Sequence, residues 1–489
     1  MTLRVLAVAS EAYPLIKTGG LADVVGALPA ALEPHGVEMT TLLPGYPIVL
    51  QQMQHGRGAK RAQVMHSYEQ LMGAKARLLH VTTASLPLIV LDAPGLFARE
   101  GGPYADRTGV DWPDNWRRFA ALAKAGADIA GGIADGYQPD LVHAHDWQAA
   151  MAPAFMRYGN ERARRTPSVM TIHNLAFQGR FDATIFPALG LPAVAFAIDG
   201  VEYFGGVGFL KAGLQTAGAI TTVSPTYAEE IRQAEFGMGL EGLIEARHAS
   251  VHGIVNGIDT AIWNPSADAN LKTVYTAASL AGRADNRRAV EQAFGLVPGK
   301  GPLFCVVSRL TWQKGMDVLA AVLDDLVDMG GRLAVLGTGD EALEAAFLTA
   351  SERFPGKVGV RIGYDEALSH LLQGGADAIL IPSRFEPCGL TQLYGLRYGC
   401  VPVVARTGGL ADTVIDANEA AVSMGVATGY QFDAVTNRSL VQAVGRAIDG
   451  FSRTRQWRTM QRQGMKADFS WTRSGKRYAD LYRQLAAGI

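Results

Sequence analysis

The sequence predicts an α/β protein made of two doubly wound domains, each with a parallel sheet. Short apolar, β-branched runs alternate with Ala-rich helical stretches, as in right-handed β-α-β units. The runs form two series, and 489 residues are enough for two separate cores. The expected strands are residues 3–9, 88–91, 141–144, 169–172 and 220–223 in the first half, and 303–307, 333–336, 379–381 and 401–404 in the second.

The two series join near residues 251–259, and polar, Pro-containing sequence follows to about Asn270. We therefore expect a first Rossmann-like domain over residues 1–252 and a second over 253–459. Residues 460–489 are expected to form a closing helix that packs back on the first domain. Two such sheets facing each other would form a deep cleft at the carboxyl ends of their strands, where sheets of this kind bind ligands.

The composition excludes several classes of partner. A formal charge of -1 gives no general attraction to nucleic acid or to an anionic membrane, so neither is an expected partner. Three scattered cysteines suit a reducing compartment better than a disulfide framework. The chain enters its first strand directly, without a recognisable signal or transit peptide, which favours a cytoplasmic location. The oligomeric state stays open.

A glycine-rich turn follows the first expected strand. It contains Lys17, Gly19, Gly20 and Asp23, ahead of a helix expected over residues 22–32. Backbone N–H groups in such a turn can approach a phosphate, and the helix N-terminus adds partial positive charge. A tight turn with an incidental lysine is the alternative. Residues 406–414 repeat seven of the nine residues of 17–25, again after a strand, so both copies are expected to open a helix.

Two further turns follow strands of the second series. After 303–307 come Arg309 and Lys314, which can both reach one diphosphate and stabilise a leaving group as it gains negative charge. After 378–381 comes Glu386, followed by the start of a helix, where backbone N–H groups from Gly389 to Thr391 would face an anion. The alternatives are an ordinary surface Arg/Lys pair and a carboxylate that only caps a helix.

The motif His143-Ala144-His145-Asp146-Trp147 raises the question of a metal site. On a strand the two histidines share one face, and Asp146 points to the other. No further ligand stands at a useful spacing, so no metal is expected here.

Together these segments resemble the bacterial glycogen synthase and plant starch synthase family. The resemblance is collinear from about Val5 to Trp471 and is supported by four further segments. They are His143–Trp147, Thr171–Asn174, Val255–Asp259 and Arg361–Tyr364. The resemblance implies a retaining glucosyltransferase of the GT-B type, with two Rossmann-like domains. It would transfer glucose from ADP-glucose to the 4-hydroxyl at the non-reducing end of an α-1,4-glucan, with no cofactor and no essential metal.

The resemblance also assigns roles to residues. Catalytic roles fall to Glu386, Arg309, Lys314, His173 and Asp146, with the two cations on the departing diphosphate. Donor contacts fall to Lys17, Gly19, Gly20, Asp23, Asn256, Tyr364, Gly389, Leu390 and Thr391, with Tyr364 stacked on the adenine. Tyr104 and Asn174 are expected on the acceptor side. One departure from many related transferases is Tyr394, which stands where those enzymes place a second glutamate.

No residue in the sequence stands out as a nucleophile, so we expect same-face displacement rather than a covalent intermediate. Other classes of protein remain as rivals. A nicotinamide dehydrogenase would need G-x-G-x-x-G after its first strand, which is missing. A glucan phosphorylase would need a cofactor lysine, and a non-catalytic glucan-binding protein would not need the two cations and Glu386 at strand ends. A related transferase with a different acceptor shares the donor loops and is the nearest rival.

Overall fold

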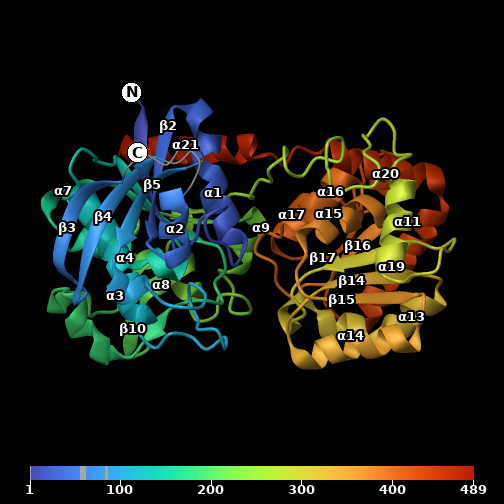
Figure 1. Ribbon diagram of the computed structural model, residues 1–489, viewed down its shortest axis with the longest axis horizontal. Helices are drawn as coiled ribbons and strands as arrows, with labels where there is room; N and C mark the ends of the chain where they lie inside the picture. The colour runs from blue at the N-terminus through green and yellow to red at the C-terminus, as the bar shows by residue number, and fades with distance from the viewer. Residues whose placement is uncertain (1, 56–61, 83–85, 489) are drawn as a thin grey trace. The chain divides into compact units, whose positions relative to one another are not determined.

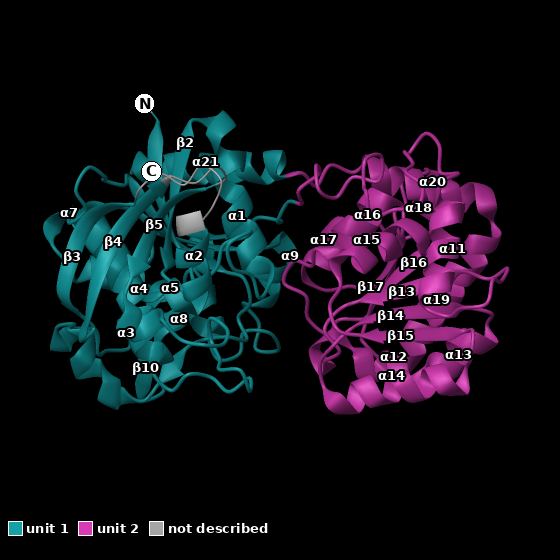
Figure 2. Cartoon of the chain, viewed as in Figure 1, with its two compact units in different colours: residues 1–257, 471–489 teal, residues 258–470 magenta. Residues whose placement is uncertain are grey.

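The computed structural model describes residues 2–55, 62–82 and 86–488, and the chain divides into two compact units (Figure 2). Unit 1 comprises Met1–Gly257 and Trp471–Ile489, and unit 2 comprises Ile258–Ser470. The first unit thus runs to residue 257 where 252 was expected, and the second ends at residue 470 where 459 was expected. The closing segment is two helices rather than one: α20 (Thr454–Lys466) belongs to unit 2, and only α21 (Trp471–Ala486) belongs to unit 1.

Unit 1 contains a nine-stranded sheet whose strand order is β12-β11-β7-β6-β1-β2-β5-β4-β3. All neighbours are parallel except β3–β4 and β4–β5, so the sheet is mixed rather than wholly parallel as expected. The strands are β1 (Leu3–Val8), β2 (Val37–Pro44), β3 (Gln63–Leu71), β4 (Ala74–Thr82), β5 (Pro87–Asp92), β6 (Leu141–His145), β7 (Ser168–Ile172), β11 (Ala219–Thr222) and β12 (Val251–Gly253). A small antiparallel sheet adds β8 (Arg180–Phe181), β9 (Glu202–Tyr203) and β10 (Gly206–Gly208).

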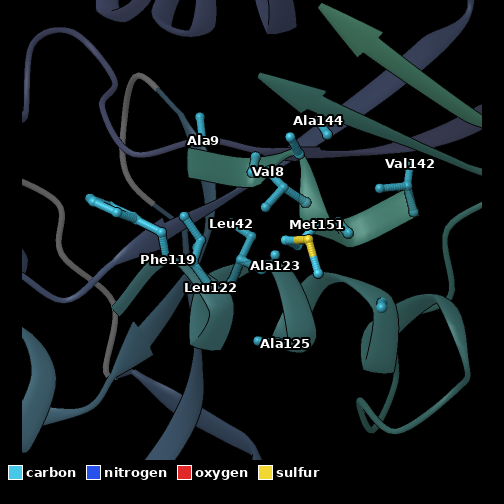
Figure 3. Close-up of a cluster of buried hydrophobic side chains, with 14 of the residues drawn as sticks. Val8, Ala9, Leu42, Phe119, Leu122, Ala123, Ala125, Val142, Ala144 and Met151 are labelled. Atoms are coloured by element: carbon cyan, nitrogen blue, oxygen red, sulfur yellow. The ribbon is translucent and has the colours of Figure 1, made fainter. Parts of the chain in front are cut away.

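Helices cover both faces of the large sheet because successive side chains of a strand point to opposite sides. Leu6 and Val8 pack with α4 (Asn115–Ala130) and α6 (Met151–Arg157) in one core, part of which Figure 3 shows. Val5 and Ala7 pack with α1 (Gly20–Leu32) and α21 in the other. The remaining helices of this unit are α2 (Pro47–His55), α3 (Pro94–Phe97), α5 (Asp146–Ala149), α7 (Glu161–Arg165), α8 (Phe209–Thr216), α9 (Pro225–Glu230) and α10 (Glu241–Ala246).

Unit 2 contains a six-stranded, wholly parallel sheet with the order β15-β14-β13-β16-β17-β18, of which Figure 1 labels β14, β15, β16 and β17. In sequence terms this is 3-2-1-4-5-6, the order of the dinucleotide-binding Rossmann fold. The strands are β13 (Leu303–Val307), β14 (Arg332–Gly337), β15 (Val358–Ile362), β16 (Ala378–Ile381), β17 (Val401–Ala405) and β18 (Tyr430–Phe432). The helices are α11 (Arg283–Ala293), α12 (Met316–Ala321), α13 (Leu323–Asp328), α14 (Glu341–Arg353), α15 (Glu366–Gly375), α16 (Thr391–Tyr398), α17 (Gly408–Thr413), α18 (Glu419–Ser423), α19 (Asn437–Ser452) and α20.

Helix α21 is tied to unit 1 by buried polar contacts as well as by apolar packing. Tyr482 Oη lies 2.7 Å from His143 Nδ1, and His143 Nε2 lies 2.5 Å from Thr171 Oγ1 on the next strand. Ser474 Oγ donates to Val255 O at 2.6 Å. The helix is also close to α1, since a Cβ on Gly475 would clash with the carbonyl of Ala31. The last residues of the chain therefore complete the core of the first unit.

The repeated glycine motif opens a helix in both units, but its two copies pack differently. Gly19 lies in extended backbone, and a Cβ there would meet nothing within 4 Å. Gly408 has φ +44°, and a Cβ there would clash with the carbonyl oxygen of Glu386. A Cβ on Gly409 would clash with the carbonyl of Cys388, and the Gly409 amide donates to Glu386 O at 3.1 Å. The second copy thus supports the backbone of the Glu386 turn.

No described helix has the length and apolar character required to cross a bilayer.

Tyr482→Phe is expected to lower the free energy of unfolding by about 1–3 kcal/mol, because it leaves a buried imidazole nitrogen of His143 without its partner. Arg473→Ala on the exposed face of α21 is the control and should stay within about 0.5 kcal/mol. Urea denaturation followed by fluorescence measures both. Equal losses in the two variants would show that the buried contact adds nothing to the anchoring of α21.

Gly408→Ala is expected to cost more than about 2 kcal/mol, since it combines backbone strain with a clash against Glu386. Gly19→Ala should cost less than about 1 kcal/mol, the price of a weaker N-cap residue. The two changes are chemically identical and fall in copies of one motif. Similar thermal shifts in both variants would contradict the different packing of the two copies.

Candidate functional site

The strand order of unit 2 reverses between β13 and β16, the usual position for a ligand in an open α/β sheet. Two of the expected residues meet there. Lys314 Nζ, from the turn after β13, lies 2.6 Å from Glu386 Oε2, from the turn after β16. Their side chains are only 16% and 9% exposed. Ser383 Oγ also donates to Glu386 Oε2, at 2.8 Å, so both contacts involve the same carboxylate oxygen.

Backbone contacts fix these two turns against each other. Gly315 is left-handed (φ +68°), and a Cβ there would clash with the carbonyl of Pro382. The Arg384 amide donates to Gln313 O at 2.9 Å. Arg384 also forms a two-point ion pair with Asp317, with both contacts at 2.7 Å. The separation of Lys314 and Glu386 is therefore set by the main chain rather than by flexible side chains alone.

Arg309 lies on the same turn as Lys314 but is exposed, and its Nη2 is 3.4 Å from Gln313 Oε1. Leu310 beside it is buried and pairs with Gly339 at the end of the neighbouring strand. The backbone at Arg309 is thus anchored, whereas its guanidinium reaches solvent at the carboxyl edge of the sheet. Such a group can meet an incoming diphosphate.

Helix α16 begins next to the Lys314–Glu386 pair. Gly389 is left-handed (φ +72°), and Leu390 and Thr391 open the helix with no side-chain cap. Gln392 is fully buried and donates through Nε2 to the carbonyls of Cys388 and Gly389, both at 2.9 Å. These two hydrogen bonds fix the backbone of the turn from its buried side. The backbone amides at the start of α16 can then face an anion.

Two tyrosines of unit 2 differ in their surroundings: Tyr364 is exposed, and Tyr394 packs against another ring. Tyr364 follows β15 at the same edge of the sheet and is 69% exposed, so its ring is accessible to a planar ligand. Tyr394, which stands where related transferases carry glutamate, stacks on Trp263 with centroids 3.6 Å apart. Trp263 stacks on His370 with its other face, at 3.8 Å, and His370 Nδ1 lies 2.6 Å from Asp268. Tyr394 therefore serves the packing of α16.

In unit 1 the strand order reverses between β1 and β6, and Asp146 directly follows β6. Asp146 is buried and left-handed (φ +54°), a conformation that is uncommon outside glycine but that Asp adopts more readily than most residues. Its Oδ1 accepts from the His173 amide at 2.7 Å, and the Asn174 amide also bonds to the carboxylate. Burial nevertheless dominates and raises the pKa of Asp146 to about 7.

The histidines beside Asp146 form a stack of neutral rings. His145 Nδ1 lies 3.0 Å from His173 Nε2, and the rings of His143 and His145 are 4.0 Å apart. Burial lowers the pKa of His143 and of His173 to about 3. Among the described residues, no cluster of three His, Cys, Asp or Glu side chains could hold a metal ion.

Glu11 is a residue that sequence reasoning missed. It follows β1, is 2% exposed, and accepts from Thr18 Oγ1 at 2.6 Å and from the Thr18 amide. Tyr104 Oη donates to the same carboxylate, and burial with this charge raises the pKa of Tyr104 well above its usual value. Glu11 thus joins Tyr104 to the glycine-rich turn. The available signal was a carboxylate three residues after the end of the first buried strand.

The other expected residues of unit 1 follow β1 and β12. Lys17 Nζ pairs with Asp23 Oδ1 at 2.7 Å, and Gly19 and Gly20 open α1 without a side-chain cap. Asn256, three residues after β12, is 5% exposed. Its Oδ1 is buried and has no hydrogen-bond partner within the described part of the chain. A buried amide oxygen of this kind is costly unless a ligand hydroxyl satisfies it.

Comparison with known proteins shows the family of the chain. A family model of the starch synthase catalytic domain matches residues 4–246, and one of the group 1 glycosyl transferases matches residues 288–463. The glycogen synthase of Novosphingobium aromaticivorans is 63% identical over 488 residues, which cover 100% of this chain and 99% of its own. That of Mesorhizobium japonicum is 62% identical over 483 residues, 99% of each chain.

Among solved structures, the catalytic domain of starch synthase IV from Arabidopsis thaliana, bound to ADP and acarbose, superposes with a TM-score of 0.87. It is 31% identical, and each chain is covered completely. Sucrose-phosphate synthase from Thermosynechococcus elongatus (TM-score 0.61, 16% identity, complete coverage of both chains) shares the fold alone. The prediction of two Rossmann-like domains of the GT-B class is confirmed. The chain belongs to the glycogen synthase family of retaining glycosyltransferases.

Proposed function

We propose that this enzyme extends an α-1,4-glucan by transferring glucose from ADP-glucose to the 4-hydroxyl of the non-reducing end, with retention of configuration. The observation that supports this most directly is the buried Lys314–Glu386 pair at the point where the strand order of unit 2 reverses. A carboxylate and an ammonium fixed side by side suit a reaction in which the sugar becomes positive as the diphosphate becomes negative.

In the donor half of this proposal, Arg309 and Lys314 hold the diphosphate, assisted by the backbone amides of Gly389, Leu390 and Thr391. The uncapped start of α16 supports this role. Both described contacts to the Glu386 carboxylate fall on Oε2, so Oε1 can face the sugar. The exposed ring of Tyr364 stacks on the adenine.

The residues of unit 1 serve the transferred sugar, the acceptor and, in the glycine-rich turn, a phosphate of the donor. His173 is neutral and can accept or donate a hydrogen bond without adding charge. Asn256 offers its unpartnered buried Oδ1 to a sugar hydroxyl. Asp146 receives the acceptor hydroxyl, with Asn174 and Tyr104 beside it. Lys17, Gly19 and Gly20 contribute cationic and backbone donors for a phosphate, while Asp23 holds Lys17.

In the proposed chemistry, the bond from the anomeric carbon to the β-phosphate oxygen breaks while a bond to the acceptor O4 forms on the same face. The acceptor proton passes to the departing phosphate oxygen. Lys314 and Arg309 stabilise the charge on the diphosphate, and Glu386 stabilises the positive charge on the sugar ring. The cations and the helix start supply the charge needed at the diphosphate, so we expect activity to persist in EDTA.

Glu386→Gln is expected to lower kcat/KM by about 100- to 1,000-fold, since the amide keeps the size of the side chain but loses its charge. The measurement is glucose incorporation into glycogen from ADP-glucose and from UDP-glucose, side by side, in EDTA. Glu341→Gln on the exposed surface of α14 is the matched control.

The outcomes of that assay separate the parts of the proposal. Wild-type rates for Glu386→Gln would remove Glu386 from the reaction. A folded enzyme that binds ADP but extends glycogen with neither donor would keep the nucleotide site and overturn the acceptor. It would then be a related transferase with a different acceptor.

Asp146→Asn is expected to change how stability depends on pH. The Asp146 pKa is about 7 in the folded protein and about 4 in an unfolded chain. The folded state therefore binds the extra proton, and wild-type stability falls relative to the variant as pH rises from about 4 to 7. Thermal midpoints of both proteins between pH 5 and 8 measure this, with exposed Asp135→Asn as control. A constant difference across that range would contradict the raised pKa.

A further inference from the structure

The turn between β9 and β10 displays an aromatic ring. Phe204 and Gly205 are both left-handed, with φ +47° and +75°, as in a two-residue type I′ hairpin turn. Such a turn favours Asn, Asp or Gly, because larger side chains are strained when φ is positive. Phe204 is 69% exposed, so the strain is not offset by burial of the ring. Backbone strain of this kind is found most often at binding and active sites.

A second strained apolar residue lies beside it. Met238 is left-handed (φ +49°) and 38% exposed, and its carbonyl accepts from Gln178 Nε2 at 3.0 Å. A Cβ built on the next residue, Gly239, would lie 3.5 Å from the Phe204 ring. Phe177, adjacent to Gln178, is 54% exposed. We call Phe177, Phe204 and Met238 the apolar patch.

The patch is continuous with the candidate acceptor residues of the same unit. The Phe177 amide donates to Asn174 O at 3.3 Å, in the turn that directly follows His173. Behind the patch, Gly179 packs so closely on Trp147 that a Cβ would clash with the indole ring. Trp147 follows Asp146 in the sequence. The same short segments therefore position both the patch and the residues proposed for the acceptor.

We propose that the apolar patch binds the glucan chain some glucose units away from the end that is extended. The inference rests on the proposed function, which supplies an α-1,4-glucan as acceptor. Glucose rings present C–H faces that stack on aromatic side chains, while their hydroxyls need polar partners. Gln178, Arg180 and Glu202 supply such partners around the patch; Arg180 Nη2 already donates to Phe204 O at 2.7 Å.

Phe204→Asn tests the proposal without endangering the fold, because asparagine favours the left-handed conformation that this turn requires. The thermal midpoint should stay level or rise. Retardation in native gels containing glycogen should weaken, and the KM for glycogen should rise about threefold to tenfold, the effect expected for one lost aromatic contact. The KM for maltotriose, which is too short to reach the patch from the extended end, should rise less.

Val64→Thr removes an exposed apolar group from β3, at the edge of the nine-stranded sheet of the same unit and outside the apolar patch, and is the matched control. Equal glycogen KM values for wild type, Phe204→Asn and Val64→Thr would overturn the proposed glucan surface while leaving the proposed function intact. An absence of glucan elongation by the wild type would instead overturn the proposed function. A changed elution volume for Phe204→Asn in size-exclusion chromatography would show that the patch joins two copies of the chain, which also overturns the proposal.

Discussion

Lys314 and Glu386 come from turns after two different strands, and their side chains meet at 2.6 Å where little solvent reaches them. Either charge alone would lose hydration there without compensation, so each requires the other in the free protein. The pair in turn requires the close backbone contacts of Gly315 with Pro382 and of Gly408 with Glu386. The strand order of the six-stranded sheet and the glycines in its turns thus together fix the position of Lys314 relative to Glu386. In the proposed reaction, a diphosphate that draws Lys314 toward it would leave the Glu386 carboxylate to act on a sugar ring that becomes positive.

The polar groups at the reversal point of unit 1 differ from the ion pair of unit 2. The reversal point of unit 1 is lined by buried imidazoles, whose pKa values burial lowers, and by Asp146, whose pKa burial raises to about 7. Hydrogen bonds, rather than full charges, dominate there, and they suit sugar hydroxyls better than phosphates. The network continues through His143 to Tyr482, so the C-terminal helix contributes to the same environment. A chain shortened before Trp471 would leave that network incomplete.

Much of the fold could be predicted because strands buried on both faces are apolar runs, which stand out in a sequence. The antiparallel β3 and β4 could not, since their exposed residues break such runs. The expected closing helix is two helices, because Ile258 pairs with Ser470 and holds the chain extended between α20 and α21.

Of the candidate site, the glycine turns and the charged residues that follow strands could be predicted from the sequence. Glu11 could not, since a single carboxylate has no spacing pattern, and the stacking of Tyr394 on Trp263 depends on residues far apart in the sequence.

The two copies of the glycine motif show how one local sequence supports different tasks. Both follow a parallel strand and open a helix, so local rules give both the same secondary structure. Their surroundings differ: Gly408 and Gly409 lie beneath another turn, where any side chain would displace Glu386, whereas Gly19 faces open space. In the second copy packing requires the absence of a side chain, whereas the surroundings of Gly19 in the first copy leave room for a Cβ. Sequence similarity within the chain therefore predicts the turn and the helix that follows it, whereas tertiary contacts decide which of its glycines tolerate a side chain.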